Sequence, residues 1–114
     1  MEIVTTEEIE NLQNRPEVLL VDVRDPPEIK STGSIPTSIN IPLGTLEETL
    51  KLPDDEFKTR FGRDKPTTDT EIIFSCKLGG RASKAAEVAI DLGFTNSKVY
   101  KGSWAEWAAY KNIN

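Results

Sequence analysis

The chain carries one cysteine, and the residues around it are of the types that turn a thiol into a nucleophile. Cys76 is followed by a loop that holds two adjacent glycines, Gly79 and Gly80. The cations Lys77 and Arg81 stand at the two ends of that loop. A free thiol has a pKa near ~8.5, and nearby cations, converging backbone N–H groups and a helix N-terminus all lower it. The pattern therefore indicates a reactive thiolate, formed without a histidine base because the chain has no histidine.

The alternative for this cysteine is a purely structural one. Free cysteines are often small buried hydrophobes, and a glycine pair or an arginine alone would be ordinary in a turn. The conjunction of Cys76, both glycines and both cations in one strand-to-helix turn favours the nucleophile. We expect the backbone N–H groups of residues 77–81 to converge on its sulfur.

Strands and helices alternate along the chain and place this turn directly after a strand. Strands are expected at 18–23, 38–41, 71–75 and 97–100. Of these, 18–23 and 71–75 are mostly apolar, which is typical of strands buried on both faces. Helices are expected at 5–13, 26–31, 45–50, 54–61, 81–92 and 103–111, the last capped by Ser103. This order predicts an α/β fold with a mainly parallel sheet, in which functional sites gather beyond the carboxyl ends of strands.

Composition restricts the partners and the compartment. We expect residues 1–114 to form a single domain, since that length is typical of one. A net charge of −5 and a pI of about 4.8 argue against nucleic acid and against an anionic membrane as partner. No cluster of cysteine, histidine and carboxylate suggests a metal, and no cofactor is expected. One cysteine cannot form an internal disulfide and the acidic start is no secretory signal, so we expect a cytoplasmic protein, with the mitochondrion as the alternative.

Charged and aromatic residues outside the loop are interpreted as structural. Asp22 and Arg24 follow a strand, and we expect Arg24 to pair with Glu28 while Asp22 ties down the neighbouring loop. Trp104 and Trp107 stand at helical spacing, which favours the core over the wall of a pocket.

Two further segments are exposed in this interpretation. Leu78 is an apolar residue within the cysteine loop, where it could shape an entrance for an acceptor or a partner protein, although an exposed leucine needs no such role. The segment 63–69 is the most loop-like of the chain and is interpreted as a plain surface connection.

Motifs spread over about residues 3–110 resemble those of the rhodanese family of sulfurtransferases. The segment 22–28 is similar to a D-V-R-x-x-x-E motif, 33–42 to G-H-I-P-G-A-x-N-I-P, 76–81 to the active loop C-x-x-G-x-R, and 101–107 to G-G-x-x-x-W. Ser34 replaces a histidine of that pattern, and Thr37 and Lys101 each replace a glycine. These departures lie outside the active loop.

The resemblance is to small, single-domain thiosulfate sulfurtransferases, and it implies a three-layer rhodanese-like sandwich with helices on both faces of the sheet. It implies that Cys76 is catalytic: its thiolate takes the outer sulfur of thiosulfate, sulfite leaves, and the persulfide passes that sulfur to glutathione, a protein thiol or cyanide. By the same resemblance, the donor is bound by Lys77, Leu78, Gly79, Gly80 and Arg81.

Other functions of the same loop stay open. A persulfide-relay or interaction module would use Cys76 in the same way but would turn over thiosulfate slowly. A phosphatase or arsenate reductase is disfavoured, because four residues separate Cys76 from Arg81 where the related phosphatases have five, and no histidine precedes the cysteine.

Overall fold

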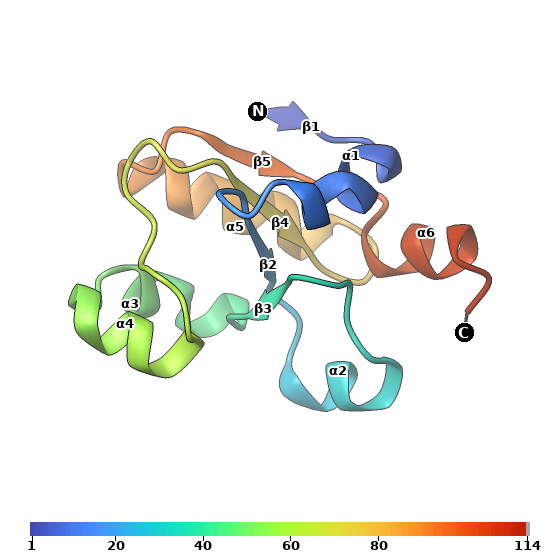
Figure 1. Cartoon of the computed structure of the whole chain (residues 1–114), viewed down its shortest axis with the longest axis horizontal. Coiled ribbons are helices and arrows are strands. Elements are labelled where there is room, and N and C mark those ends of the chain that lie inside the picture. Colours follow the sequence, from blue (N-terminus) through green and yellow to red (C-terminus); the bar gives the residue numbers. More distant parts are fainter. Residues whose placement is uncertain (114) are drawn as a thin grey trace.

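A computed structural model describes residues 1–113 and has a five-stranded sheet at its centre (Figure 1). The strands are β1 (Glu2–Ile3), β2 (Leu19–Asp22), β3 (Ile39–Asn40), β4 (Ile72–Ser75) and β5 (Ser97–Val99). Their order across the sheet is β1-β5-β4-β2-β3, and every neighbouring pair is parallel. Every residue of β2 and β4 is buried, as the unbroken apolar runs predicted.

Eight helical segments connect and cover these strands. They are α1 (Thr6–Glu10), the 3-10 helix η1 (Asn11–Asn14), α2 (Pro26–Thr32), the 3-10 helix η2 (Leu43–Thr45), α3 (Leu46–Leu50), α4 (Asp54–Phe61), α5 (Gly80–Asp91) and α6 (Ser103–Tyr110). Helix α2 buries none of its residues and stands away from the sheet beyond the end of β2 (Figure 1). None of the helices within residues 1–113 is long and apolar enough to cross a membrane.

Alternate residues of the central strands point to opposite faces of the sheet and enter two separate cores. Val21 and Phe74 pack with residues of α3, α4 and α5 on one face, whereas Leu20 and Ile73 pack with residues of α1 and α6 on the other. These four side chains are fully buried, and burying one such side chain stabilises a fold by roughly 1.5–3 kcal/mol. The predicted α/β fold with helices on both faces of a parallel sheet is confirmed.

The structure corrects the expectation for the beginning of the chain. β1 extends the sheet at its edge, where Glu2 lies opposite Lys98 of β5, and a two-residue strand offers no periodicity from which to predict it. The capping box of Thr5 and Glu8 forms as predicted. The helix that it opens ends at Glu10, however, and the chain continues as a 3-10 helix.

Residues with positive φ mark several of the boundaries. α4 ends at Gly62, whose φ is +72°, as the sequence predicted, and Gly93 follows α5 with a φ of +102°. Thr37 adopts a φ of +74° where the rhodanese motif carries glycine. A β-branched residue is strained in that conformation, so the substitution keeps the family's backbone shape at an energetic cost.

Candidate active site

The sulfur of Cys76 lies at the carboxyl end of β4, at the base of the turn that leads into α5, and the residue is buried. The backbone N–H of Gly79 points at Sγ from 3.0 Å and that of Ala82 from 3.4 Å. The hydroxyl of Ser103 approaches the same sulfur at 3.8 Å. Backbone N–H groups therefore converge on the sulfur. Gly79 lies within the expected range 77–81, whereas Ala82, in the first turn of α5, lies just beyond it.

Gly79 and Gly80 have different structural roles in this turn. Gly79 has a φ of +104°, a conformation that favours glycine. In addition, a Cβ atom at this position would overlap the backbone oxygen of Lys101. Gly80 is the first residue of α5, and a Cβ atom there would meet nothing within 4 Å. The shape of the cradle therefore depends on the first glycine of the pair.

Burial and hydrogen bonding have opposite effects on the pKa of the Cys76 thiol. Burial raises the pKa of Cys76, but the N–H groups of Ala82 and Gly79, the Ser103 hydroxyl and the N–H of Leu78 together bring the pKa below its ordinary value. These hydrogen-bond donors lower the pKa of Cys76 the most. From the sequence alone, we expected the neighbouring cations to lower it as well. These donors favour the charged form of the thiol.

Ser103 is a site residue that the sequence assigned to another role. Its predicted role as the cap of α6 is wrong: Gly102 holds the cap position and no side chain caps the helix. Instead the fully buried Ser103 hydroxyl accepts the N–H of Cys76 at 3.0 Å and donates to the Tyr100 carbonyl at 2.8 Å. Ser103 itself has a φ of +57°. A hydroxyl has one hydrogen, so it donates either to that carbonyl or to the cysteine sulfur.

Helix α6 also holds the main chain of the active loop. The N–H of Trp104 donates to the Cys76 carbonyl at 2.9 Å, and the N–H of Ala105 donates to the Lys77 carbonyl at 3.1 Å. The free N–H groups at the start of a helix thus find their acceptors in the loop. No local pattern predicts this contact, because the two segments are far apart in the sequence; the similarity of residues 101–107 to a rhodanese motif was the available signal.

The ion pairs around the loop differ from those expected. Arg81 makes a bidentate pair with Glu28, with N–O distances of 2.7 and 3.0 Å. The guanidinium of Arg81 lowers the pKa of Glu28 to about 2, and Glu28 in turn raises the pKa of Arg81. The positive charge of Arg81 is therefore compensated by Glu28.

The predicted pair between Arg24 and Glu28 is wrong. Arg24 is fully buried and binds Asp22, with its Nη2 2.8 Å and its Nε 3.0 Å from Oδ2. Its remaining donors reach the Thr32 hydroxyl at 2.9 Å and the Gly33 carbonyl at 3.0 Å. A buried guanidinium must satisfy all of its donors, and Asp22 is buried beside it, whereas Glu28 lies on the half-exposed first turn of α2 and faces α5.

A depression of about 330 Å³ adjoins the loop. It is lined by Arg24, Pro27, Glu28, Ser31, Thr32, Lys77 and Trp104. Trp104 is buried in the core, as expected, but it also contributes to this wall, and the guanidinium carbon of Arg24 lies 5.2 Å from its ring centroid. Trp107 is buried in the same core. Leu78 is 73% exposed at the mouth of the loop.

Comparisons with known proteins agree with this geometry. Residues 5–110 match the family model described as a rhodanese-like domain. The chain is 44% identical to the rhodanese domain-containing protein CG4456 of Drosophila melanogaster, over 97% of this chain and 100% of the fly protein. It is 43% identical to the mitochondrial thiosulfate sulfurtransferase RDL2 of Saccharomyces cerevisiae, over 94% of this chain and 72% of the yeast protein.

A human protein and a solved human structure are also similar to this chain. The chain is 32% identical to the human thiosulfate:glutathione sulfurtransferase, over 91% of this chain and 90% of that protein. The solved structure of the human single-domain sulfurtransferase TSTD1 superposes with a TM-score of 0.86 at 31% identity, covering 96% of each chain.

Proposed function

Since this chain belongs to the rhodanese-like domain family, we propose that it is a thiosulfate sulfurtransferase that carries sulfane sulfur on Cys76 and delivers it to a thiol. Sulfur transfer is the reaction for which the yeast relative RDL2 and the human thiosulfate:glutathione sulfurtransferase are named. The observation that carries the proposal is the convergence of the Gly79 and Ala82 N–H groups on the Cys76 sulfur.

In the first half-reaction the Cys76 thiolate attacks the outer sulfur of thiosulfate. A new S–S bond forms as the S–S bond of thiosulfate breaks, and the bonding pair departs with sulfite. The total charge is unchanged, because the thiolate becomes a persulfide anion and one dianion replaces another. The N–H groups of Gly79 and Ala82 stabilise the negative sulfur at both ends of this step. Splitting the transfer in two predicts ping-pong kinetics.

Lys77 and Arg81 contribute unequally to recognition of the donor in this proposal. Both were expected to balance the sulfonate charge. Arg81 is already neutralised by Glu28, whereas the exposed Lys77 forms no ion pair with any of residues 1–113. Lys77 therefore supplies most of the uncompensated charge that attracts thiosulfate, while the Arg81 and Glu28 pair braces the loop against α2.

In the second half-reaction a thiol attacks the outer sulfur of the persulfide, and the Cys76 thiolate is released as the leaving group. The depression beside the loop offers a place for that thiol. Its wall includes Lys77 and Trp104, and the uncompensated Lys77 ammonium suits a small peptide thiol that carries carboxylates. Glutathione has that chemistry, and it is the acceptor named for the human relative.

Mass spectrometry of the intact protein tests the first half-reaction. After incubation with thiosulfate the protein should gain one sulfur atom on Cys76 and lose it when a thiol is added. Cys76→Ser is the matched control and should gain nothing. A wild-type protein whose mass does not change would contradict the proposal.

A persulfide-relay module is the second candidate, and the exposure of Leu78 beside the nucleophile is the observation that favours it. An apolar side chain at the mouth of the site suits contact with a partner protein. Steady-state kinetics with thiosulfate and glutathione separate the two functions, because a relay would show a negligible kcat/KM while still accepting sulfur.

A cytoplasmic location stays a prediction, and the name of the yeast relative favours the mitochondrion as its alternative.

A further inference from the structure

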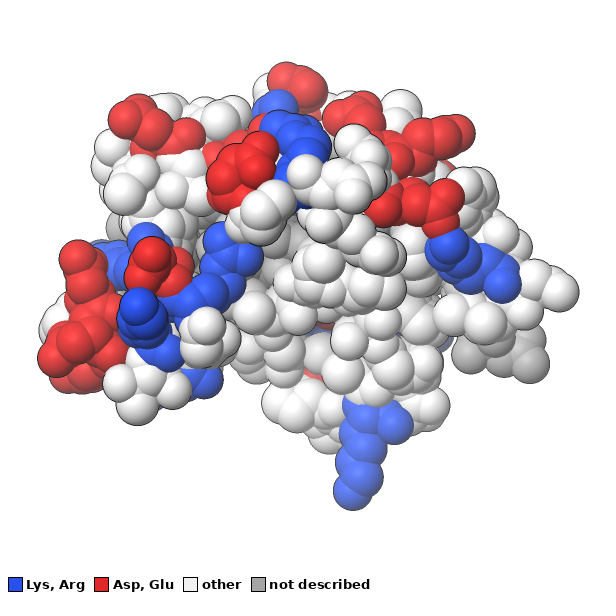
Figure 2. Space-filling view, in the orientation of Figure 1, with Lys and Arg blue, Asp and Glu red and all other residues white. Residues whose placement is uncertain are grey.

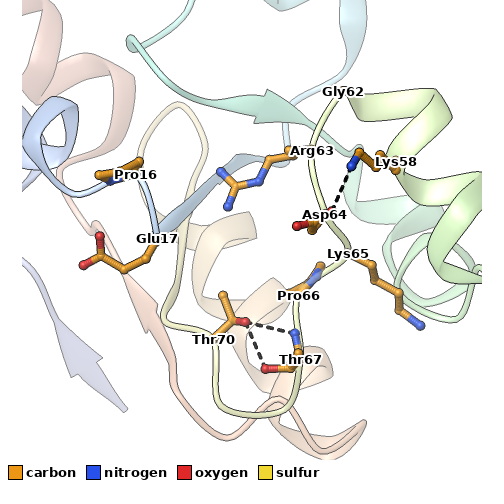
Figure 3. A pocket seen from close by; sticks show the side chains of 10 residues that line it. All are labelled: Pro16, Glu17, Lys58, Gly62, Arg63, Asp64, Lys65, Pro66, Thr67 and Thr70. Carbon is orange, nitrogen blue, oxygen red and sulfur yellow. Dashed lines mark hydrogen bonds and ion pairs between the residues drawn. The ribbon is translucent and has the colours of Figure 1, made fainter.

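We propose that a hollow at the amino-terminal end of the sheet binds a small phosphate-bearing molecule through Arg63, independently of sulfur transfer. The hollow encloses about 570 Å³ (Figure 3), within the range of small-molecule sites. It is lined by Pro16, Glu17, Lys58, Gly62, Arg63, Asp64, Lys65, Pro66, Thr67 and Thr70. The loop 63–69, interpreted from sequence as a plain surface connection, supplies half of this lining.

The hollow lies at the opposite edge of the sheet from the nucleophile. Pro16 and Glu17 precede β2, and Thr70 precedes β4, whereas Cys76 follows β4. Because β2 and β4 are parallel neighbours, their amino-terminal ends meet at one edge and their carboxyl ends at the other. A ligand in the hollow would therefore leave the Cys76 cradle free.

Arg63 is the group that lacks a partner. Its Nε is buried and has no hydrogen-bond partner, and its guanidinium projects into the hollow between the Pro16–Glu17 segment and Asp64 (Figure 3). Arg15 and Arg24 instead bind carboxylates at 2.9 and 2.8 Å. A buried charged donor without an acceptor is costly. An oxyanion in the hollow would accept from the terminal nitrogens of the Arg63 guanidinium.

The local charges favour an anion although the whole chain is acidic. Both carboxylates of the lining already have a cation: Asp64 lies 3.5 Å from Lys58, and Glu17 lies 3.5 Å from Arg15. Arg63 and Lys65 make no ion pair within residues 1–113. Figure 2 shows Lys and Arg side chains gathered, among acidic ones, on the side of the molecule where α4 lies.

A phosphate monoester fits these groups better than a single carboxylate. It carries a charge of about −1.5 to −2 and three acceptor oxygens at neutral pH, enough for the two uncompensated cations, Arg63 and Lys65. Thr67 and Thr70 add hydroxyls on the same wall, 3.2 Å apart. The volume exceeds what a bare phosphate needs, so the ligand class is a phosphorylated small molecule.

Amide NMR of the ¹⁵N-labelled full chain tests this site, with Cys76→Ser as the background so that sulfur transfer plays no part. The probes are inorganic phosphate, pyrophosphate and adenosine monophosphate, with sulfate as the matched anion. All titrations are run at about 0.15 M salt, where weak surface attraction is largely screened. The expected result is saturable shifts confined to Glu17 and the non-proline residues of 58–70, with adenosine monophosphate tighter than phosphate and sulfate weakest.

Two variants and a control locate the binding group. Arg63→Gln should weaken binding at least about tenfold, because a charge-assisted bidentate contact is lost, and Lys65→Gln should weaken it less while leaving the fold untouched. Arg60→Gln on α4, which lies outside this lining, should bind like the parent.

The proposal is overturned by any of four results. The first is the absence of saturable shifts up to about 20 mM probe, roughly the weak limit of specific binding. The second is equal binding by Arg63→Gln and its parent, and the third is sulfate binding as tightly as every phosphate compound. The fourth is a set of shifts confined to residues 76–82. The last result would move the anion site to the nucleophile. None of these outcomes bears on the persulfide, which is tested on the wild-type chain.

Discussion

The two ends of the sheet attract negative charge by different means. At the carboxyl end, the Cys76 sulfur faces backbone N–H groups of Gly79 and Ala82, and the nearest arginine is neutralised by Glu28. At the amino-terminal end, the attraction comes from a side chain, Arg63, whose buried Nε has no partner.

The difference matters because backbone and side-chain donors respond differently to change. A backbone N–H cannot be removed by most substitutions, and its direction is fixed by the fold around it. A guanidinium can be deleted by one substitution, and its attraction for ions falls with salt. The carboxyl end is therefore suited to holding one reactive atom in one place, and the opposite end to reversible binding. The predictions below break or sharpen this contrast.

The largest effect is expected for Cys76→Ser, which leaves the cradle in place and removes the nucleophile. Thiosulfate:thiol turnover should fall to the uncatalysed background, and the persulfide should not form, because a serine hydroxyl is not ionised at neutral pH. A melting temperature close to that of the wild type would show that the fold is intact. Retained turnover would refute the role of Cys76.

Arg24→Gln should cost the most stability of any change at the carboxyl end. Removing one partner of a buried ion pair costs about 3–5 kcal/mol, here because the carboxylate of Asp22 is left buried without its cation. Urea denaturation measures the loss. Arg63→Gln is the contrast at the opposite end and should change stability little, since that guanidinium holds no carboxylate. Equal losses in the two variants would remove the contrast.

Gly79→Ala should damage the cradle, whereas Gly80→Ala should not. Alanine at a φ of +104° costs about 1–2 kcal/mol, and its Cβ would also push against the Lys101 carbonyl and shift the N–H that faces the sulfur. We expect kcat/KM to fall at least about 100-fold, in line with the loss of a preorganised donor to the reacting atom. At Gly80 space is free. Similar kinetics for the two variants would contradict a cradle built on backbone geometry.

Ser103→Ala should raise the pKa of the Cys76 thiol, since a hydrogen bond to the charged form is lost. A raised pKa means that a higher pH is needed to form the thiolate. The rate of alkylation by iodoacetamide against pH measures it. Ser83→Ala, on α5 away from the sulfur, is the control. An unchanged pH midpoint would leave Ser103 with a structural role only.

The smallest effect is expected for Glu28→Gln. The folded-state pKa of Glu28 is depressed to about 2, so its pair with Arg81 stabilises the fold above the unfolded pKa and this contribution is lost as pH falls towards 2. The variant should lose less stability than the wild type between pH 4.5 and 2. Because Arg81 then has no carboxylate partner, the KM of the Glu28→Gln variant for thiosulfate should fall about two- to fivefold, a typical effect of a half-exposed charge. A raised KM would show that the pair itself positions the loop.

Local sequence was enough to single out the candidate nucleophile, Cys76, and to predict most of the scaffold. Buried strands such as β2 and β4 are unbroken apolar runs, and α4 is bounded by a proline and a glycine, so neighbouring residues carry the signal. The cysteine, the glycine pair and the first turn of α5 are likewise contiguous. Hydrophobic periodicity and backbone preference act over a few residues, which is why these features can be predicted from sequence.

What surrounds the sulfur was decided by tertiary structure alone. Ser103 meets Cys76 across 27 positions, and Arg81 meets Glu28 across 53. The choice of Asp22 over Glu28 as the partner of Arg24 depended on which carboxylate the fold buried beside that guanidinium. Charged and polar side chains pair with whatever the packed chain brings within about 3 Å, and no local pattern contains that information.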